Sequence, residues 1–151
     1  MDAKIAGKKV SEDLWFLFDN KSVLGVLLYG SVVEGETTER SDIDVCVVAP
    51  AADDKVAFSR WILANVRDER YDVRVFELMP LYLQMEVVEY GEVVHARDIY
   101  ELYEYFYAFR KLWDDQKRRQ MLTREEALEL FTQPFSFKKK IVSEKKNNKK
   151  K

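Results

Sequence analysis

The chain has 151 residues, of which 47% are hydrophobic and 34% are charged. This length fits one ordinary domain with a helical extension, and it is enough to bury a core without disulfides. The single cysteine, Cys46, excludes a disulfide framework and a multi-cysteine zinc site. No run reaches the roughly 18 apolar residues of a membrane span, and residues 1–13 do not resemble a signal peptide. We therefore expect a cytoplasmic protein without a membrane segment.

The formal net charge of −2 conceals an asymmetry along the chain. Residues 138–151 contain eight lysines and one glutamate, so the rest of the chain is strongly acidic. An acidic body makes nucleic acid an unsuitable partner and suits divalent cations. The basic tail is expected to be disordered. It is open to three interpretations: a solvated end, a contact with RNA phosphates, or docking on the acidic body or a partner.

Hydrophobic periodicity predicts helices and strands in alternation. In chain order the first are a helix over 12–20 capped by Ser11, a strand over 22–29, a helical turn and loop over 32–41, a strand over 42–49, and a helix to about Val66 capped by Asp53 or Asp54. There follow a strand over 71–77, a helix over 80–91, an extended piece over 92–96, a helix capped by Asp98 that runs to about Met121, and a last helix over 123–131. This order predicts an α/β (α+β) fold, with helices packed on a small mixed sheet. We expect a core over 1–97, a helical extension over 98–137 and a tail over 138–151.

Two aspartates interrupt the apolar strand that follows the first loop. Asp42 and Asp44 are two residues apart, so the period of a strand places both on one face. Adjacent carboxylates repel each other, and burying them is costly unless they are paired or bound to a metal. Hard oxygen ligands suit Mg²⁺. A pair of this kind also occurs at exposed strand ends, so the pattern alone leaves both interpretations open.

Two further features accompany the pair. Gly30 and Ser31 end the preceding strand, where a close backbone approach and a hydroxyl would suit a phosphate, although a tight turn has the same composition. Asp72 lies in the strand over 71–77, on the same face as Arg74. It could reach the same metal and accept a proton from a hydroxyl, or it could pair with Arg74.

Together these residues resemble the minimal nucleotidyltransferase family of the DNA polymerase-β-like superfamily. Its motif is Gly-Ser, ten residues, then Asp-x-Asp, and this chain reads GSVVEGETTERSDID over 30–44. The resemblance extends over about residues 11–120. It implies that Gly30 and Ser31 bind the phosphates of a nucleotide and that Asp42, Asp44 and Asp72 bind two Mg²⁺ ions and carry the catalysis. ATP is the implied substrate, attacked at its α-phosphate with release of pyrophosphate.

Small members of this family are commonly antitoxins paired with a HEPN ribonuclease toxin, onto which they can transfer AMP at a tyrosine. The only histidine, His95, lies in an apolar stretch and does not form a HEPN ribonuclease motif, so such a toxin would be a separate chain. Three alternatives stay open: a small-molecule acceptor, an RNA acceptor, and a binding module without enzymatic activity. The scarcity of residues for a second domain disfavours the small molecule, and the acidic body disfavours RNA.

Aromatic residues on the helix from Asp98 span more of its circumference than one-sided packing needs. One stripe contains Ile99, Leu102, Phe106, Phe109 and Trp113 and is widened by Tyr105, and a second contains Tyr100, Tyr103 and Tyr107. We expect the first stripe to pack on the sheet. The second would meet a toxin or a second copy through helix 98–119, or would be covered by the helix over 123–131.

Overall fold

The computed structural model describes residues 2–35 and 42–132, with the side chains of 119–128 and 130–132 left out. The chain divides into two compact units, Met1–Lys111 and Leu112–Lys151. The predicted tail over 138–151 lies outside the described residues. No helix within the described ranges is long and apolar enough to cross a membrane. The cytoplasmic location and the domain boundaries at 97/98 and 137/138 stay predictions.

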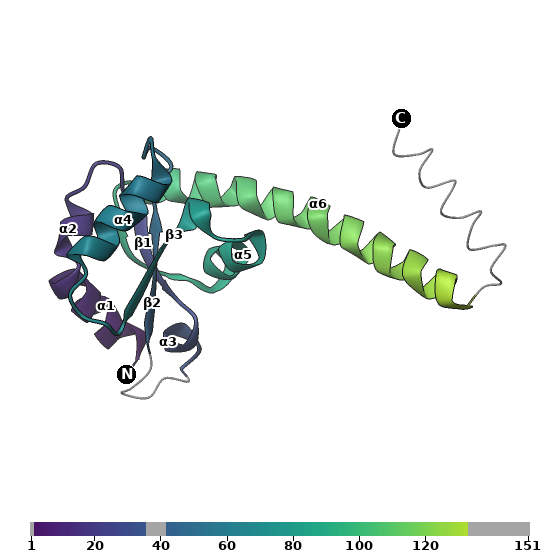
Figure 1. Cartoon of the computed structure of the whole chain (residues 1–151), viewed down its shortest axis with the longest axis horizontal. Helices are drawn as coiled ribbons and strands as arrows, with labels where there is room; N and C mark the ends of the chain where they lie inside the picture. Colours follow the sequence, from purple (N-terminus) through teal and green to yellow (C-terminus); the bar gives the residue numbers. More distant parts are fainter. Residues whose placement is uncertain (1, 36–41, 133–151) are drawn as a thin grey trace. The chain divides into compact units, whose positions relative to one another are not determined.

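The first unit is built on a four-stranded sheet with the strand order β3-β2-β1-β4 (Figure 1). Its strands are β1 (Gly25–Tyr29), β2 (Ile43–Val48), β3 (Tyr71–Val75) and β4 (Glu92–Ala96). β1 pairs antiparallel with both β2 and β4, whereas β2 and β3 are parallel. The predicted small mixed sheet is therefore confirmed, with its four members close to the predicted positions.

The helices connect and cover these strands. They are α1 (Ala3–Asp13), α2 (Trp15–Phe18), α3 (Ser31–Glu34), α4 (Lys55–Asn65), the 3-10 helix η1 (Phe76–Leu78), α5 (Leu81–Tyr90) and α6 (Ile99–Thr132). Asp54 caps α4 by accepting a hydrogen bond from the Ala57 N–H at 3.0 Å. Asp98 caps α6 in the same way, through the N–H groups of Tyr100 and Glu101. The predicted cap at Asp98 is confirmed, and of the two candidates for α4, Asp53 and Asp54, the structure has Asp54.

The predicted start of the first helix at Ser11 is wrong. The cap of α1 lies nine residues earlier, where the Asp2 carboxylate accepts a hydrogen bond from the Ile5 N–H at 2.8 Å. Ser11 lies inside α1, and its hydroxyl donates to the Gly7 carbonyl at 3.0 Å. Only Ala6 and Val10 of this helix are buried, so its apolar stripe is too narrow to stand out among its lysines.

The predicted break near Met121 is also wrong, because α6 continues from Ile99 to Thr132. The capping-box spacing at Thr123 occurs inside this helix and does not start a new one. In the first unit, Leu102 and Phe106 of α6 are buried, as expected for the packed stripe. Tyr100, Tyr103 and Tyr107 are exposed by 79%, 56% and 57%, so this second stripe is open on the described surface.

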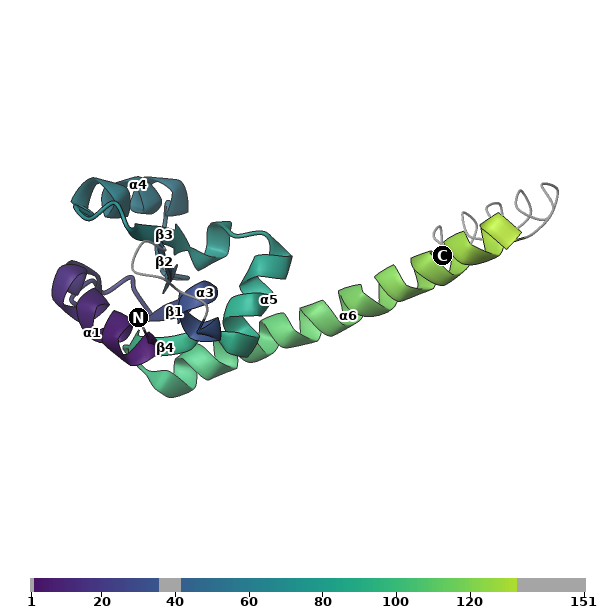
Figure 2. The same ribbon diagram turned by 90° about the horizontal axis from the view of Figure 1, so that it is seen from below.

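The two faces of the sheet are covered by different helices (Figure 2). α1, α2 and α4 cover one face, whose core includes alternate residues of β2 and β3: Ile43, Val45, Val47, Tyr71, Val73 and Val75. On the other face, the ring of Phe76 lies within 6 Å of the rings of Tyr105, Phe106 and Phe109 on α6. The remaining residues of β2 and β3, among them Asp44 and Asp72, point to this second face by alternation.

Candidate nucleotide and metal site

Three of the predicted site residues, Asp42, Asp44 and Asp72, lie at the same end of the sheet's strands. β1 ends and β2 begins there, because the two strands are antiparallel, and β3 begins beside β2. In register, Asp44 faces Tyr29 of β1 on one side and Asp72 of β3 on the other. Asp42 is exposed and precedes β2 by one residue. We call Asp42, Asp44, Asp72 and Arg74 the acidic face.

Gly30 and Ser31, the candidate phosphate-binding residues, lie at the same end of the strands. Gly30 follows β1 with a φ of +73° and a ψ of −146°, a conformation that side chains rarely allow. A Cβ atom at this position would collide with the carboxylate of Asp44. Ser31 is the first residue of α3, whose turn forms as the Gly30 carbonyl accepts from the N–H groups of Val33 and Glu34. Residues 36–41 of the motif lie outside the described residues.

The electrostatics of the acidic face are dominated by its excess of carboxylates. Burial raises the pKa of Asp44, and the negative charges of Asp72 and Asp42 raise it further. Arg74 opposes them and lowers it. The Arg74 Nε lies 3.6 Å from the Asp72 Oδ1, so the predicted alternative of an ion pair between these two residues is confirmed.

Two neighbours were missed in the sequence. Burial and the charge of Asp44 raise the pKa of Tyr29, which is the last residue of β1 and is 4% exposed. Glu86 on α5 adds a further negative charge that raises the pKa of Asp44. Tyr29 reads as an ordinary buried strand residue, and Glu86 as a polar helix residue. Only the pairing of strands and the packing of α5 bring them to the acidic face.

The donor set of the acidic face fits a hard divalent cation by its chemistry. Mg²⁺ prefers oxygen ligands, and its positive charge would neutralise three carboxylates that repel one another. Their side chains do not converge fully: within residues 2–35 and 42–132, no group of three or more acidic, histidine or cysteine side chains is arranged to hold a metal ion. Asp72 is turned toward Arg74 instead.

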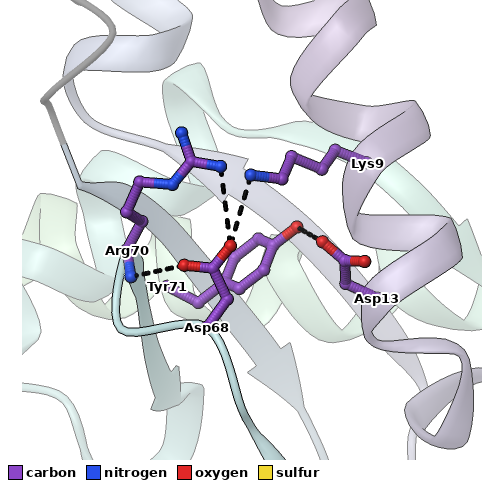
Figure 3. Close-up of polar contacts among 5 residues, drawn as sticks. All are labelled: Lys9, Asp13, Asp68, Arg70 and Tyr71. Atoms are coloured by element: carbon purple, nitrogen blue, oxygen red, sulfur yellow. Dashed lines mark hydrogen bonds and ion pairs between the residues drawn. The ribbon is translucent and has the colours of Figure 1, made fainter.

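A second polar cluster lies on the face of the sheet that α1 covers (Figure 3). The Asp68 carboxylate accepts from Lys9 of α1 at 3.3 Å and from Arg70 at 3.5 Å. The Tyr71 hydroxyl donates to Asp13 at 2.6 Å. We call Lys9, Asp13, Asp68, Arg70 and Tyr71 the balanced cluster, because its two cations match its two carboxylates.

A cavity of about 600 Å³ borders the balanced cluster. It is lined by Glu12, Asp13, Leu14, Trp15, Phe16, Ala64, Asn65, Arg67, Asp68 and Tyr71. None of the predicted site residues lines it. Since Tyr71 and Asp72 point to opposite faces of β3, this cavity and the acidic face are different places.

The other two residues considered in the sequence have structural surroundings. Cys46 is completely buried, as predicted, and burial raises the pKa of its thiol well above the ordinary value. His95 of β4 stacks on the ring of Phe18, with ring centroids 4.6 Å apart and planes 10° apart. Neither residue belongs to the acidic face.

Comparisons with known proteins agree with the motif. A family model described as a nucleotidyltransferase domain matches residues 8–94. A protein of Methanocaldococcus jannaschii, described as a candidate protein adenylyltransferase, is 41% identical over 97 residues. That match covers 64% of this chain and 75% of the relative.

Solved structures show the same fold. A chain from a crystal structure of a toxin–antitoxin with AMP-PNP matches with a TM-score of 0.60 and 19% identity, over 78% of this chain and 98% of its own. A chain from the complex of a tri-AMPylated Shewanella oneidensis HEPN toxin with an MNT antitoxin matches with a TM-score of 0.56 and 13% identity, over 83% and 98%. At these identities the likeness concerns the fold alone.

The predicted fold class is thereby confirmed. The match of the family model spans the Gly-Ser turn and all three aspartates, and it covers more than half of the chain. With the 41% identical relative, it shows that this chain belongs to the nucleotidyltransferase domain family and is a nucleotidyltransferase.

Proposed function

We propose that the chain is a Mg²⁺-dependent adenylyltransferase that moves AMP from ATP onto a tyrosine hydroxyl of a HEPN-type ribonuclease toxin on a separate chain, and so acts as its antitoxin. The observation that carries this proposal is the acidic face: Asp44 and Asp72 in register on adjacent strands, beside the Gly30–Ser31 turn. Excess negative charge there attracts a divalent cation, which would in turn bind the negatively charged triphosphate.

The proposal gives each residue a role. Gly30 leaves room for the Asp44 carboxylate, and the Ser31 hydroxyl binds a phosphate oxygen. Mg²⁺, bound by Asp42, Asp44 and Asp72, would neutralise charge on the triphosphate and the leaving group. Asp72 accepts the proton of the attacking hydroxyl. A bond forms between the tyrosine oxygen and the α-phosphorus, the bond to the bridging oxygen breaks, and pyrophosphate leaves with that electron pair.

Three observations support a protein toxin as the acceptor of AMP. The relative from M. jannaschii is described as a protein adenylyltransferase. The structural neighbours include a complex of a HEPN toxin that carries AMP. The exposed tyrosines of α6 also give this chain an aromatic surface that suits a protein partner, a toxin or a second copy of this chain.

The test is transfer of label from α-³²P-ATP with Mg²⁺, with and without the HEPN-type product of a neighbouring gene. Asp44→Asn should lower transfer by about 10²-fold or more, because it removes a carboxylate of the acidic face. Asp53→Asn is the matched control, since Asp53 is an exposed aspartate in the turn after β2. It should keep transfer within about twofold of the wild type.

The outcomes separate the alternatives. Label on a toxin tyrosine, identified by mass spectrometry, together with loss of ribonuclease activity supports the proposal. Inhibition of the ribonuclease without label would favour a binding module. Label on a small molecule or RNA alone would change the acceptor class, and transfer by Asp44→Asn at the wild-type rate would reject the site.

A further inference from the structure

Arg74 is a guanidinium placed among the carboxylates of the acidic face. It follows Asp72 by two residues on β3, so both side chains point to the same face. In the parallel register Asp72 lies beside Asp44 and Arg74 lies beside Cys46. The side chains of Arg74 and Asp72 are 52% and 42% exposed, which leaves the pair open to solvent.

The charge of Arg74 acts on more than its ion-pair partner. It lowers the pKa of Asp44, against the effects of burial and of Asp72, Asp42 and Glu86, all of which raise it. In return, Asp72 raises the pKa of Arg74 most, and Asp44 contributes to the same shift. The geometry agrees: Arg74 pairs with Asp72 at 3.6 Å, and Asp72 lies in register beside Asp44 on the adjacent strand.

A divalent cation would need the same carboxylate oxygens. Guanidinium stays protonated at any working pH, so Arg74 cannot yield its place by losing a proton. Arg74 can leave the carboxylates only by rotating its side chain, and a half-exposed side chain on an edge strand has room to rotate. The ion pair is also weak enough to break, because both of its members face water.

We infer that Arg74 is the internal counter-ion of the acidic face and that it competes with a divalent cation for Asp72 and Asp44. This inference rests on the proposed function, since the cation is the one that the transfer reaction requires. In the free protein Arg74 holds the two carboxylates against their mutual repulsion. When the cation binds, Arg74 turns away, and the affinity for metal without nucleotide is lowered by its presence. Arg74 is thus a positioning residue.

The test is a titration of the nucleotide-free, full-length protein with Mn²⁺, which takes the same oxygen ligands. The electron paramagnetic resonance signal of the free hydrated ion gives the bound fraction directly. Arg74→Gln removes the counter-ion and should lower the dissociation constant for Mn²⁺ roughly three- to tenfold. Arg74→Lys keeps the charge and should stay within about twofold of the wild type.

Arg70→Gln is the matched control. Arg70 is a second arginine of similar exposure, 41%, and it pairs with an aspartate at a similar distance, 3.5 Å. Its partner, however, is Asp68 of the balanced cluster (Figure 3). The substitution changes the net charge by the same amount, so a general charge effect would appear in both variants.

The outcomes distinguish this inference from the proposed function. If Arg74→Gln and Arg70→Gln change the Mn²⁺ affinity equally, or not at all, the counter-ion role is overturned. Asp44→Asn should abolish the same binding in either background. If it leaves Mn²⁺ binding intact, or if no variant binds Mn²⁺, the metal site of the proposed function fails as well.

Discussion

The acidic face and the balanced cluster are both polar, and both include residues at the start of β3. In the balanced cluster, Lys9 and Arg70 surround one carboxylate, and the other accepts a hydrogen bond from Tyr71. In the acidic face, three carboxylates lie near one cation of the described residues, Arg74. The first arrangement satisfies its own charges and stabilises the contact of α1 with the sheet. The second has more carboxylates than cations among its described residues, and their repulsion costs stability that a bound cation would relieve.

The largest expected effect comes from exchanging one aspartate in each region. Asp44→Asn should lower nucleotide transfer by about 10²-fold or more, yet raise the melting temperature by roughly 1–4 °C, because it relieves repulsion. Asp68→Asn should do the opposite: transfer stays within about twofold, and the melting temperature falls because Lys9 and Arg70 lose their partner. Calorimetry and the transfer assay on both variants measure the contrast. Equal effects on both quantities would erase the distinction between the two regions.

The next effect concerns the backbone that approaches Asp44. Gly30 and Gly35 both have positive φ, +73° and +76°. A Cβ atom at Gly30 would collide with the Asp44 carboxylate, whereas one at Gly35 would meet nothing within 4 Å. Gly35→Ala should therefore cost about 1 kcal/mol of backbone strain alone, and Gly30→Ala about 1–2 kcal/mol more.

Urea denaturation measures the free energy of unfolding of both variants, and the transfer assay measures their activity. Because the collision in Gly30→Ala displaces the Asp44 carboxylate, this variant should also lose most of its transfer activity, while Gly35→Ala keeps it. Equal stability losses in the two variants would show that Gly30 serves only the turn and not the acidic face.

The smallest effect is a pH dependence. The folded-state pKa of Asp44 is raised above its ordinary value of 3.8, so its contribution to stability is present below about pH 3.8 and is lost as the pH rises through the folded-state pKa. Asp44→Asn removes this loss. Its gain in stability over the wild type should be small near pH 4 and larger at pH 7, as measured by urea denaturation at both pH values. A gain in stability that is the same at both pH values would have a cause other than the ionisation of Asp44.

Local patterns predicted most of the sheet and the caps, because strand alternation and short-range capping depend on neighbours in the chain. Alternation predicts the strand over 71–77, and an apolar run ended by Pro50 predicts the strand over 42–49. Position before a helix predicts the cap at Asp98 and leaves Asp53 and Asp54 as candidates for the other cap. α1 was missed since only Ala6 and Val10 mark its buried side. The break at Thr123 was misplaced because a capping-box spacing also occurs within a continuous helix.

The candidate site was predicted in its composition but not in its contacts. The motif spacing identified Gly30, Ser31, Asp42 and Asp44, and it left the role of Asp72 open between a metal ligand and a partner of Arg74. The balanced cluster escaped prediction altogether, since Lys9 and Asp68 are 59 residues apart and Asp13 and Tyr71 are 58 apart. Pairs so distant in the chain are brought together only by the packing of α1 on the sheet.

The most direct test is a crystal structure of the chain with AMP-PNP and Mn²⁺, whose anomalous signal locates the metal. The account predicts a Mn²⁺ peak between the carboxylates of Asp44 and Asp72, the triphosphate beside Gly30 and Ser31, and Arg74 turned away from Asp72. A nucleotide bound instead in the cavity bordered by Trp15 and Tyr71, with Arg74 still paired to Asp72, would contradict it.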